Sequence, residues 1–312
     1  MLNDKIIVLP ICGGGLKGTI SIEFLYQLDQ KFILKYKKSL LDIVDFYAGT
    51  SVGSIITAPL AFGVPVEIIH EIITKKGAKL FKRNWLPWKP KYTNKYILEE
   101  LRRVITLYND RVPEITDCKK KIMCITTDHV SDENVYLKSW KERWNKLSIL
   151  DAIQYSFSAC YYFGATNAPQ YQMVFGDGGE GLDNCPLRET INSLKRTGVL
   201  GHNKVQHVCV ISVGTGFVPS NRTYKSVSRW GKVREMLPYV KGLARKQSTK
   251  ANVYNAQAEA SSNPYFKFVH ADIEIESKHD VLDGKKYIEQ YKQYGRQMYA
   301  HNANAILDML DN

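Results

Sequence analysis

Acidic side chains are scarce in this 312-residue sequence: 31 Asp and Glu stand against 43 Lys and Arg, which gives a formal net charge of +12. This imbalance favours anionic partners, either a lipid surface or a nucleotide. Apolar residues make up 44% of the chain, which is enough for one large α/β core and too much for a disordered protein.

Long hydrophobic runs are also absent. The most apolar stretch, residues 55–66, is too short to cross a bilayer and contains Pro59 and Pro65. Residues 1–5 include an acid and no apolar core, so no signal peptide is expected. We therefore expect a cytoplasmic protein that meets the inner membrane surface only peripherally.

The sequence has no Cys-x-x-Cys motif, although it has six cysteines. We expect reduced and mostly buried thiols. The cysteines are Cys12, Cys118, Cys124, Cys160, Cys185 and Cys209.

A Walker loop is missing too, because neither Gly-Lys-Ser nor Gly-Lys-Thr occurs. A glycine-rich segment is nevertheless present at residues 12–18, after an apolar run that predicts a buried strand over residues 6–11. Apolar residues then recur at helical spacing, so the glycines fall between a strand and a helix. Such a loop exposes backbone N–H groups that suit a phosphate or the oxyanion of an attacked ester.

Within this segment, Gly13, Gly15 and Gly18 match the spacing of a dinucleotide-binding fingerprint. That fingerprint requires an acidic residue at the end of a second strand, about twenty residues later. Residues 31–38 are basic and helical in pattern instead, which argues against a dinucleotide site.

The most informative motif is Gly49-Thr50-Ser51-Val52-Gly53, which follows the largely apolar residues 43–47. Its G-x-S-x-G spacing is typical of a nucleophile elbow, where a strand turns so sharply into a helix that glycines flank the exposed serine. The same residue types also occur in ordinary strand-to-helix turns. Ser51 is the predicted nucleophile.

A third glycine cluster, Gly176-Asp177-Gly178-Gly179, follows a predicted short strand at residues 172–175. Glycines on both sides of Asp177 allow it to lie beside a serine on a neighbouring strand, although a tight turn capped by Asp has the same pattern. Together the three clusters supply an oxyanion loop, a nucleophile and a base.

These motifs resemble those of the patatin-like phospholipase family, in order, from residue 6 to residue 216. The Gly13 to Gly18 segment is similar to the oxyanion motif of the family, the Ser51 segment to its elbow, and Asp177-Gly178-Gly179 to its Asp-Gly-Gly. Residues 158–163 resemble Ser-Ala-Pro-x-Tyr-Phe with Cys160 in place of proline, and residues 212–216 resemble Ser-Leu-Gly-Thr-Gly. Asn184 and Pro186 lie near the usual Asn-Pro, Ser54 replaces a common glycine, and Pro59 is expected to kink the helix after Ser51.

The resemblance implies a three-layer α/β/α sandwich with a mostly parallel central sheet, and a Ser-Asp dyad. Asp177 would take the proton from Ser51, and water would then hydrolyse the acyl-enzyme. The resemblance also implies supporting residues: Gly13, Gly14 and Gly15 for the oxyanion hole, Lys17 to orient that loop or pair with an acid, and Gly49, Gly53 and Gly178 around the dyad. The implied substrate is a phospholipid, lysophospholipid or other acyl lipid, and the cycle needs neither metal nor organic cofactor.

Two basic segments lie outside these motifs. Residues 75–95 interleave lysines with Phe81, Trp85, Trp88 and Tyr92, which is typical either of a membrane-docking lid or of a solvated loop with packed tryptophans. In residues 222–250 the basic side chains are opposed only by Glu235, so the segment is either a solvated face or a regulatory feature. Some bacterial proteins resembling this family are antiviral effectors switched on by a cyclic nucleotide, and the same activation is a hypothesis here.

Two other functions remain open from the residues alone. An ordinary α/β-hydrolase requires a histidine after the acid in chain order, and the candidates are His202, His207, His270 and His279. A nucleic-acid or nucleotide binding protein without hydrolytic activity would use the basic, Trp- and Tyr-rich stretch as a stacking surface.

The remaining sequence alternates predicted strands and helices, as a sheet covered on both faces requires. We expect a catalytic core over residues 1–216 and a basic, mainly helical part over residues 217–312 packed on the same domain; the oligomeric state is not predicted. Expected elements are helices from Pro65 to near Gly77, after a cap at Thr93, from Ser148 to Ser158 and over 187–194, and strands over 121–127 and 134–140.

Overall fold

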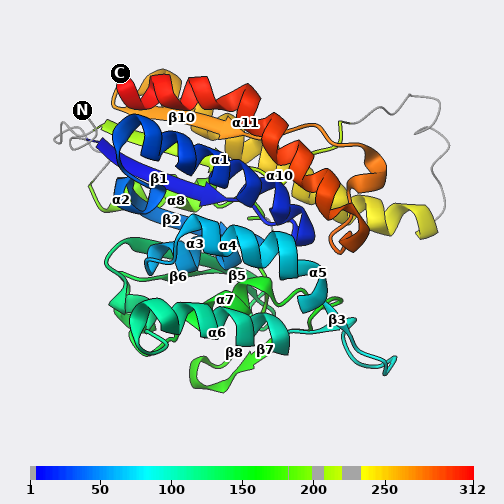
Figure 1. Ribbon diagram of the computed structural model, residues 1–312. Coiled ribbons are helices and arrows are strands. Elements are labelled where there is room, and N and C mark those ends of the chain that lie inside the picture. The colour runs from blue at the N-terminus through cyan, green and yellow to red at the C-terminus, as the bar shows by residue number, and fades with distance from the viewer. Residues whose placement is uncertain (1–4, 182, 199–206, 220–232) are drawn as a thin grey trace.

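An eight-stranded sheet runs through the middle of the protein, and helices cover both of its faces in the computed structural model (Figure 1). The structure describes residues 5–181, 183–198, 207–219 and 246–312 in full, and residues 233–245 as helical backbone. The strands of this sheet are β1 (Lys5–Ile11), β2 (Val44–Thr50), β5 (Lys121–Asp128), β6 (Glu133–Lys138), β7 (Thr166–Ala168), β8 (Met173–Asp177), β9 (His207–Val213) and β10 (Phe266–Ala271).

The sheet is mostly parallel. Strands β10, β9, β1, β2 and β5 lie side by side in that order and run in the same direction. Strands β6 and β8 both pair antiparallel with β5, and β7 pairs antiparallel with β8. The carboxyl ends of the parallel strands lie along one side of the sheet. In such folds, the loops at this side bind ligands.

Alternation of side chains along the strands explains the three layers. In β1, Ile7, Leu9 and Ile11 are buried in one core together with side chains of α1, α3 and α11. Val8 points to the opposite face and joins a second core with side chains of α8 and α10. The predicted α/β/α sandwich with a mostly parallel sheet is therefore confirmed.

The main helices are spread over the whole chain. They are α1 (Gly18–Tyr36), α2 (Leu40–Ile43), α3 (Val52–Ala61), α4 (Val66–Glu71), α5 (Gly77–Leu80), α6 (Lys95–Asn109), α7 (Ile149–Phe157), α8 (Leu187–Arg196), α10 (Val233–Ser262) and α11 (Ile288–Asp311). Short strands β3 (Lys82–Arg83) and β4 (Tyr92–Thr93) form a separate hairpin. Among the described residues, no helix is long and apolar enough to cross a membrane.

Two helix boundaries differ from the sequence analysis. Asn94 rather than Thr93 occupies the cap position of α6, although the Thr93 hydroxyl still accepts the Lys95 N–H at 3.3 Å. The helix that begins after Pro65 does not end near Gly77: it passes through a π-helical segment, Ile72–Lys76, and continues as α5. Gly77 takes ordinary right-handed helical angles, which is why it does not end the helix.

The C-terminal part of the chain contributes to the central sheet. Strand β10, for which the sequence analysis placed no strand, pairs in parallel with β9. Helix α11 packs against α1 and lies beside it in Figure 1. The division at residue 216 remains a proposal.

All six cysteines are free, as expected. Cys12, Cys124, Cys185 and Cys209 are buried, Cys118 is half-buried and Cys160 is exposed.

Candidate active site

Ser51 lies at the tight turn where β2 passes into α3. Its backbone has φ 56° and ψ −123°, a conformation that costs a side-chain-bearing residue about 1–3 kcal/mol. A Cβ at Gly49 would lie 2.5 Å from the Gly53 carbonyl carbon, and a Cβ at Gly53 would lie 2.2 Å from the Ile11 carbonyl oxygen. The strained serine and both crowded glycines are the features of a nucleophile elbow.

The register of β5 brings Asp177 to this elbow. Residues 123–125 of β5 pair with β6 and β2, and residues 126–128 pair with β6 and β8. Because a strand has only two edges, β2 and β8 share the edge of β5 opposite β6. Thr50 pairs with Ile125, and Asp177 pairs with Thr126. The last residues of β2 and β8 therefore lie beside adjacent residues of β5.

Shared neighbours link the two predicted catalytic residues. The Ser156 hydroxyl accepts the Ser51 N–H at 3.0 Å, and the Ser156 carbonyl accepts the Gly178 N–H at 3.4 Å. The Asn184 side-chain oxygen lies 2.7 Å from a Cβ built on Gly13 and 2.7 Å from one built on Gly179. The Cβ built on Gly13 also lies 3.2 Å from Ser51 Cβ, and the Cβ built on Gly179 lies 3.2 Å from Asp177 Oδ1.

Asp177 is held in a tight turn at the end of β8. Its side chain is buried, and its Oδ1 accepts the Gly179 N–H at 2.7 Å. A Cβ on Gly178 would lie 2.6 Å from the Ile125 carbonyl oxygen, so the chain must have glycine there. A tight turn capped by Asp177 is thus compatible with a position of Asp177 in the active site.

The glycine-rich loop follows β1 and faces the elbow. The Gly13 N–H donates to the Asn184 carbonyl at 2.9 Å, so this donor is already engaged. No acceptor for the N–H groups of Gly14 and Gly15 is found among the described residues. Of the three residues expected to form the oxyanion hole, Gly14 and Gly15 therefore remain as candidate donors.

Contacts from the far end of the chain fix this loop. Buried Lys17 forms an ion pair with Asp280 at 2.5 Å, so it pairs with an acid, one of its two expected roles. The Thr215 hydroxyl donates to the Gly13 carbonyl at 3.0 Å, and the Leu16 N–H donates to the Leu282 carbonyl at 2.7 Å. Neither Asp280 nor Leu282 was a candidate in the sequence analysis, because no motif surrounds them.

Ser156 is a further residue that the sequence analysis missed. It is fully buried, and its hydroxyl donates to the Ile125 carbonyl at 2.6 Å while lying 2.8 Å from the Ser54 hydroxyl. Ser54, noted above as replacing a common glycine, thereby joins the support of the elbow and also donates to the Gly49 carbonyl at 2.8 Å.

An apolar pocket of about 570 Å³, including the open space at its mouth, adjoins Ser51. It lies between α3, the π-helical segment, α5 and α6, and its wall is almost wholly hydrocarbon. The wall includes Ile55, Ile72, Ile73, Leu80, Phe81, Leu101, Phe157 and Phe163. Such a cavity suits an extended apolar group attached to an ester.

Three of the four histidines considered for the α/β-hydrolase alternative lie among the described residues. His207 is the first residue of β9 and pairs with Lys5 at the start of β1. It therefore lies at the amino-terminal end of the parallel strands, whereas Ser51 follows the carboxyl end of β2. His279 lies 2.9 Å from the Tyr294 hydroxyl, and His270 lies 2.9 Å from the Ser212 hydroxyl. Burial lowers the pKa of His270, but the Asp272 carboxylate, 3.7 Å from His270 Nε2, and the neighbouring Cys185 raise that pKa above the usual value. His202 lies outside the described residues.

The basic segment at residues 75–95 includes an exposed hairpin loop. Residues 84–91 connect β3 to β4, and we name them the tryptophan loop. Trp85 is 88% exposed and Trp88 is 77% exposed, so these two rings are not packed. Figure 1 shows the loop projecting from the body of the protein near β3. Of the other basic segment, residues 222–250, the side chains up to residue 245 lie outside the described residues.

The sequence is similar to known proteins over most of its length. The family model for patatin-like phospholipase matches residues 9–191. The cGAMP-activated phospholipase of Escherichia coli (strain TW11681) is 23% identical over 73% of this chain and 67% of that protein. Patatin-T5 of Solanum tuberosum is 25% identical over 85% of this chain and 76% of that protein.

Among solved structures, VipD from Legionella pneumophila is similar with a TM-score of 0.39 and 11% identity, covering 93% of this chain and 66% of that chain.

Proposed function

Since the chain belongs to the patatin-like phospholipase family, we propose that it is a serine acyl hydrolase of the phospholipase A or lysophospholipase type that uses a Ser51-Asp177 dyad. One observation carries the assignment of residues: Thr50 and Asp177 pair with adjacent residues of β5, on the same edge of that strand. This register supports a short approach between a strained serine and a buried carboxylate.

The chemistry follows from the groups at the elbow. Asp177 accepts the proton as the Ser51 hydroxyl attacks the ester carbonyl, and it gives this proton to the leaving alcohol oxygen as the ester bond breaks. The N–H groups of Gly14 and Gly15 donate to the oxyanion that develops. Asp177 then removes a proton from water, which attacks the acyl-enzyme; the bond to Ser51 breaks, Asp177 returns the proton to the Ser51 oxygen, and the fatty acid is released.

The apolar pocket next to Ser51 is the proposed site of the acyl chain. Because its wall offers few polar groups, it favours a hydrocarbon chain over a peptide or a nucleotide. The alternative of a nucleotide-binding protein without hydrolytic activity is therefore disfavoured for this pocket.

The tryptophan loop is the proposed membrane contact. Phe81 lines the pocket and lies four residues before Trp85, so the exposed rings are close in the chain to the pocket wall. Lys82, Arg83 and Lys89 are also exposed and would attract anionic headgroups. Docking through this loop would deliver a lipid to the pocket while the protein stays at the membrane surface.

Activation by a cyclic nucleotide, with membrane degradation in antiviral defence, is the proposed regulation. Its support is the similarity to the cGAMP-activated phospholipases of Escherichia coli and Vibrio cholerae, at 23% and 22% identity. Adding cGAMP to the purified protein should raise lipid hydrolysis and increase thermal stability. If a panel of cyclic oligonucleotides neither binds nor stimulates the protein, this proposal is wrong and the hydrolase proposal is unaffected.

The decisive experiment is mass spectrometry of a mixed lipid extract incubated with the parent protein or with Ser51→Ala. Free fatty acid and lysolipid that form only with the parent protein would identify the reaction and the lipid class. Equal product with both proteins would overturn the assignment of Ser51.

A further inference from the structure

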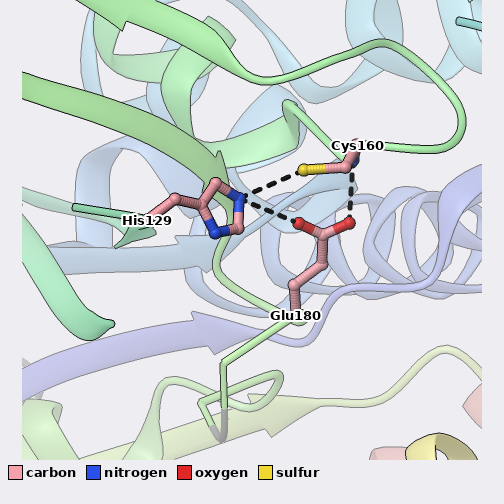
Figure 2. Close-up of side chains that lie close together, drawn as sticks. All are labelled: His129, Cys160 and Glu180. Atoms are coloured by element: carbon pink, nitrogen blue, oxygen red, sulfur yellow. Dashed lines mark hydrogen bonds and ion pairs between the residues drawn. The ribbon is translucent and has the colours of Figure 1, made fainter. Parts of the chain in front are cut away.

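Three side chains that can bind metals converge near the turn that contains Asp177. His129 Nε2 lies 3.1 Å from Cys160 Sγ and 3.5 Å from Glu180 Oε2, and Figure 2 shows all three pointing toward one another. One atom from each residue lies within 4.8 Å of the other two. About a third of the His129 and Glu180 side chains is exposed, so an ion has access from solvent.

The three residues come from three different segments of the fold. His129 directly follows β5, Cys160 lies after α7, and Glu180 lies three residues after Asp177. The Glu180 N–H donates to the Asp177 carbonyl at 2.9 Å, so Glu180 belongs to the same turn as the proposed base. Cys160 is 31 residues from His129 and 20 residues from Glu180, and these spacings match no common metal-binding motif.

The backbone around the cluster leaves room for it. A Cβ on Gly176 would lie 2.1 Å from His129 Nε2 and 2.9 Å from Glu180 Oε2. Glycine at this position therefore allows the imidazole and the carboxylate to meet over β8. Glu180 is oriented further because its Oε1 accepts the Cys160 N–H at 2.8 Å.

The donor set and spacing suit a zinc ion. Zinc bonds of about 2.0–2.3 Å in tetrahedral geometry place neighbouring donor atoms roughly 3.4–3.6 Å apart. The observed separations of 3.1 and 3.5 Å are close to those values. A thiolate and an imidazole favour zinc or cobalt over magnesium and calcium, and three protein ligands leave the fourth position to water.

We propose that His129, Cys160 and Glu180 form a zinc site that ties the segment after α7 to the turn carrying Asp177. Within the described structure, the segment after α7 also contacts the tryptophan loop: the Lys91 N–H donates to the Tyr161 carbonyl at 3.1 Å. It further supplies Phe163 to the wall of the pocket. A bound ion would therefore stabilise the turn that carries Asp177. It would also stabilise the segment after α7, which forms part of the pocket wall and contacts the tryptophan loop.

Metal binding at this site has a defined proton balance. The thiol of Cys160 is protonated near neutral pH, because the ordinary pKa of a cysteine is about 8.5. Zinc binding forms a sulfur–metal bond, breaks the S–H bond and releases that proton to solvent.

The test uses the full-length protein, freed of metal with a chelator and titrated with Co²⁺. We expect one ion per chain and a sulfur-to-cobalt charge-transfer band in the near ultraviolet, which Zn²⁺ displaces. Cys160→Ser should remove the band, and His129→Gln and Glu180→Gln should each weaken binding by at least about 10- to 100-fold, the loss that follows when only an outer-shell partner of a ligand is removed. Zinc should raise the unfolding temperature of the parent protein by a few degrees, with no rise in Cys160→Ser.

Cys118→Ser is the matched control, because it removes a half-buried thiol that donates to the Ala61 carbonyl, away from the cluster. This variant should bind cobalt as the parent protein does. A missing band in the parent protein, or a band that persists in Cys160→Ser, would overturn the proposal. Repeating the titration in Ser51→Ala separates it from the proposed function, since metal binding there is measured without hydrolysis.

Discussion

The elbow at Ser51 and the tryptophan loop are both expected to contact lipid, yet different physical constraints shape them. At the elbow, backbone atoms approach so closely that Gly49 and Gly53 have no room for a side chain. At the tryptophan loop, Trp85 and Trp88 extend into solvent and few contacts restrict their identity. A site under hard steric constraint can be recognised from a short motif, whereas an exposed surface is defined only by which groups the fold leaves uncovered.

The largest expected effect separates chemistry from stability at the elbow. Asp177→Asn and Ser51→Gly should each lower kcat by about 10⁴-fold or more, because the nucleophile and its base act as a unit. Ser51→Gly should also be more stable than Ser51→Ala by about 1 kcal/mol, since glycine adopts φ 56° without strain. Esterase assays and denaturant unfolding measure the two effects.

Histidine variants provide the control for this prediction. His207→Ala, His270→Ala and His279→Ala should all keep substantial activity toward an activated ester. A loss of about 10⁴-fold in kcat for any one of these variants would favour a Ser-His-Asp mechanism instead, because the members of a triad also act as a unit.

The next effect tests the steric constraint itself. Gly53→Ala places a methyl group 2.2 Å from the Ile11 carbonyl oxygen, so β1 and α3 must separate. We expect a loss of about 1–3 kcal/mol in the free energy of unfolding. Gly77→Ala is the matched control: its Cβ would meet Leu16 at an ordinary 3.6 Å, and its effect should be neutral or slightly stabilising. Equal effects of the two substitutions would contradict the constraint.

The tryptophan loop should behave in the opposite way. Replacing Trp85 and Trp88 together with alanine should change the free energy of unfolding by less than about 0.5 kcal/mol. Binding to phosphatidylglycerol vesicles should fall at least about tenfold, because each ring that leaves the interface forfeits apolar burial. Vesicle sedimentation gives the affinity, and tryptophan fluorescence reports the insertion.

A buried tryptophan serves as the comparison for that experiment. Trp144 is only 3% exposed and packs in the main core. Trp144→Ala should therefore cost about 3–5 kcal/mol of stability. Vesicle binding by the Trp85/Trp88 variant equal to that of the parent protein would exclude the loop as the docking surface.

The smallest effect concerns the pocket wall. Arg103, and then Lys76 of the π-helical segment, lower the pKa of Glu100 to about 2. Because this folded-state pKa lies below the unfolded value, the stabilisation is present above about pH 4.5 and is lost as the pH falls toward 2. Glu100→Gln should thus be slightly less stable than the parent protein at pH 6, with a difference that shrinks by pH 3. Unfolding curves across this range test the sign; a constant difference would mean that the ion pairs contribute nothing.

Much of the fold could be predicted because its elements carry local signals. The continuous apolar run in β1 is a signal of this kind. Ser148, which caps α7 by accepting the Asp151 N–H at 3.1 Å, is another. The edge strand β10 could not be predicted in this way, because its place depends on pairing with β9, far away in the chain. The π-helical continuation after Glu71 is likewise a product of packing rather than of sequence pattern.

By itself, the sequence determined the glycine-flanked Ser51, the Asp-Gly-Gly turn and the α/β alternation, since each depends on sterics or periodicity over a few residues. Only the tertiary structure decided that Asp280 pairs with Lys17, that Ser156 lies under both catalytic segments, and that His129, Cys160 and Glu180 meet. These contacts join segments tens to hundreds of residues apart. Their geometry is set by strand register and helix packing, which no local pattern of residue types encodes.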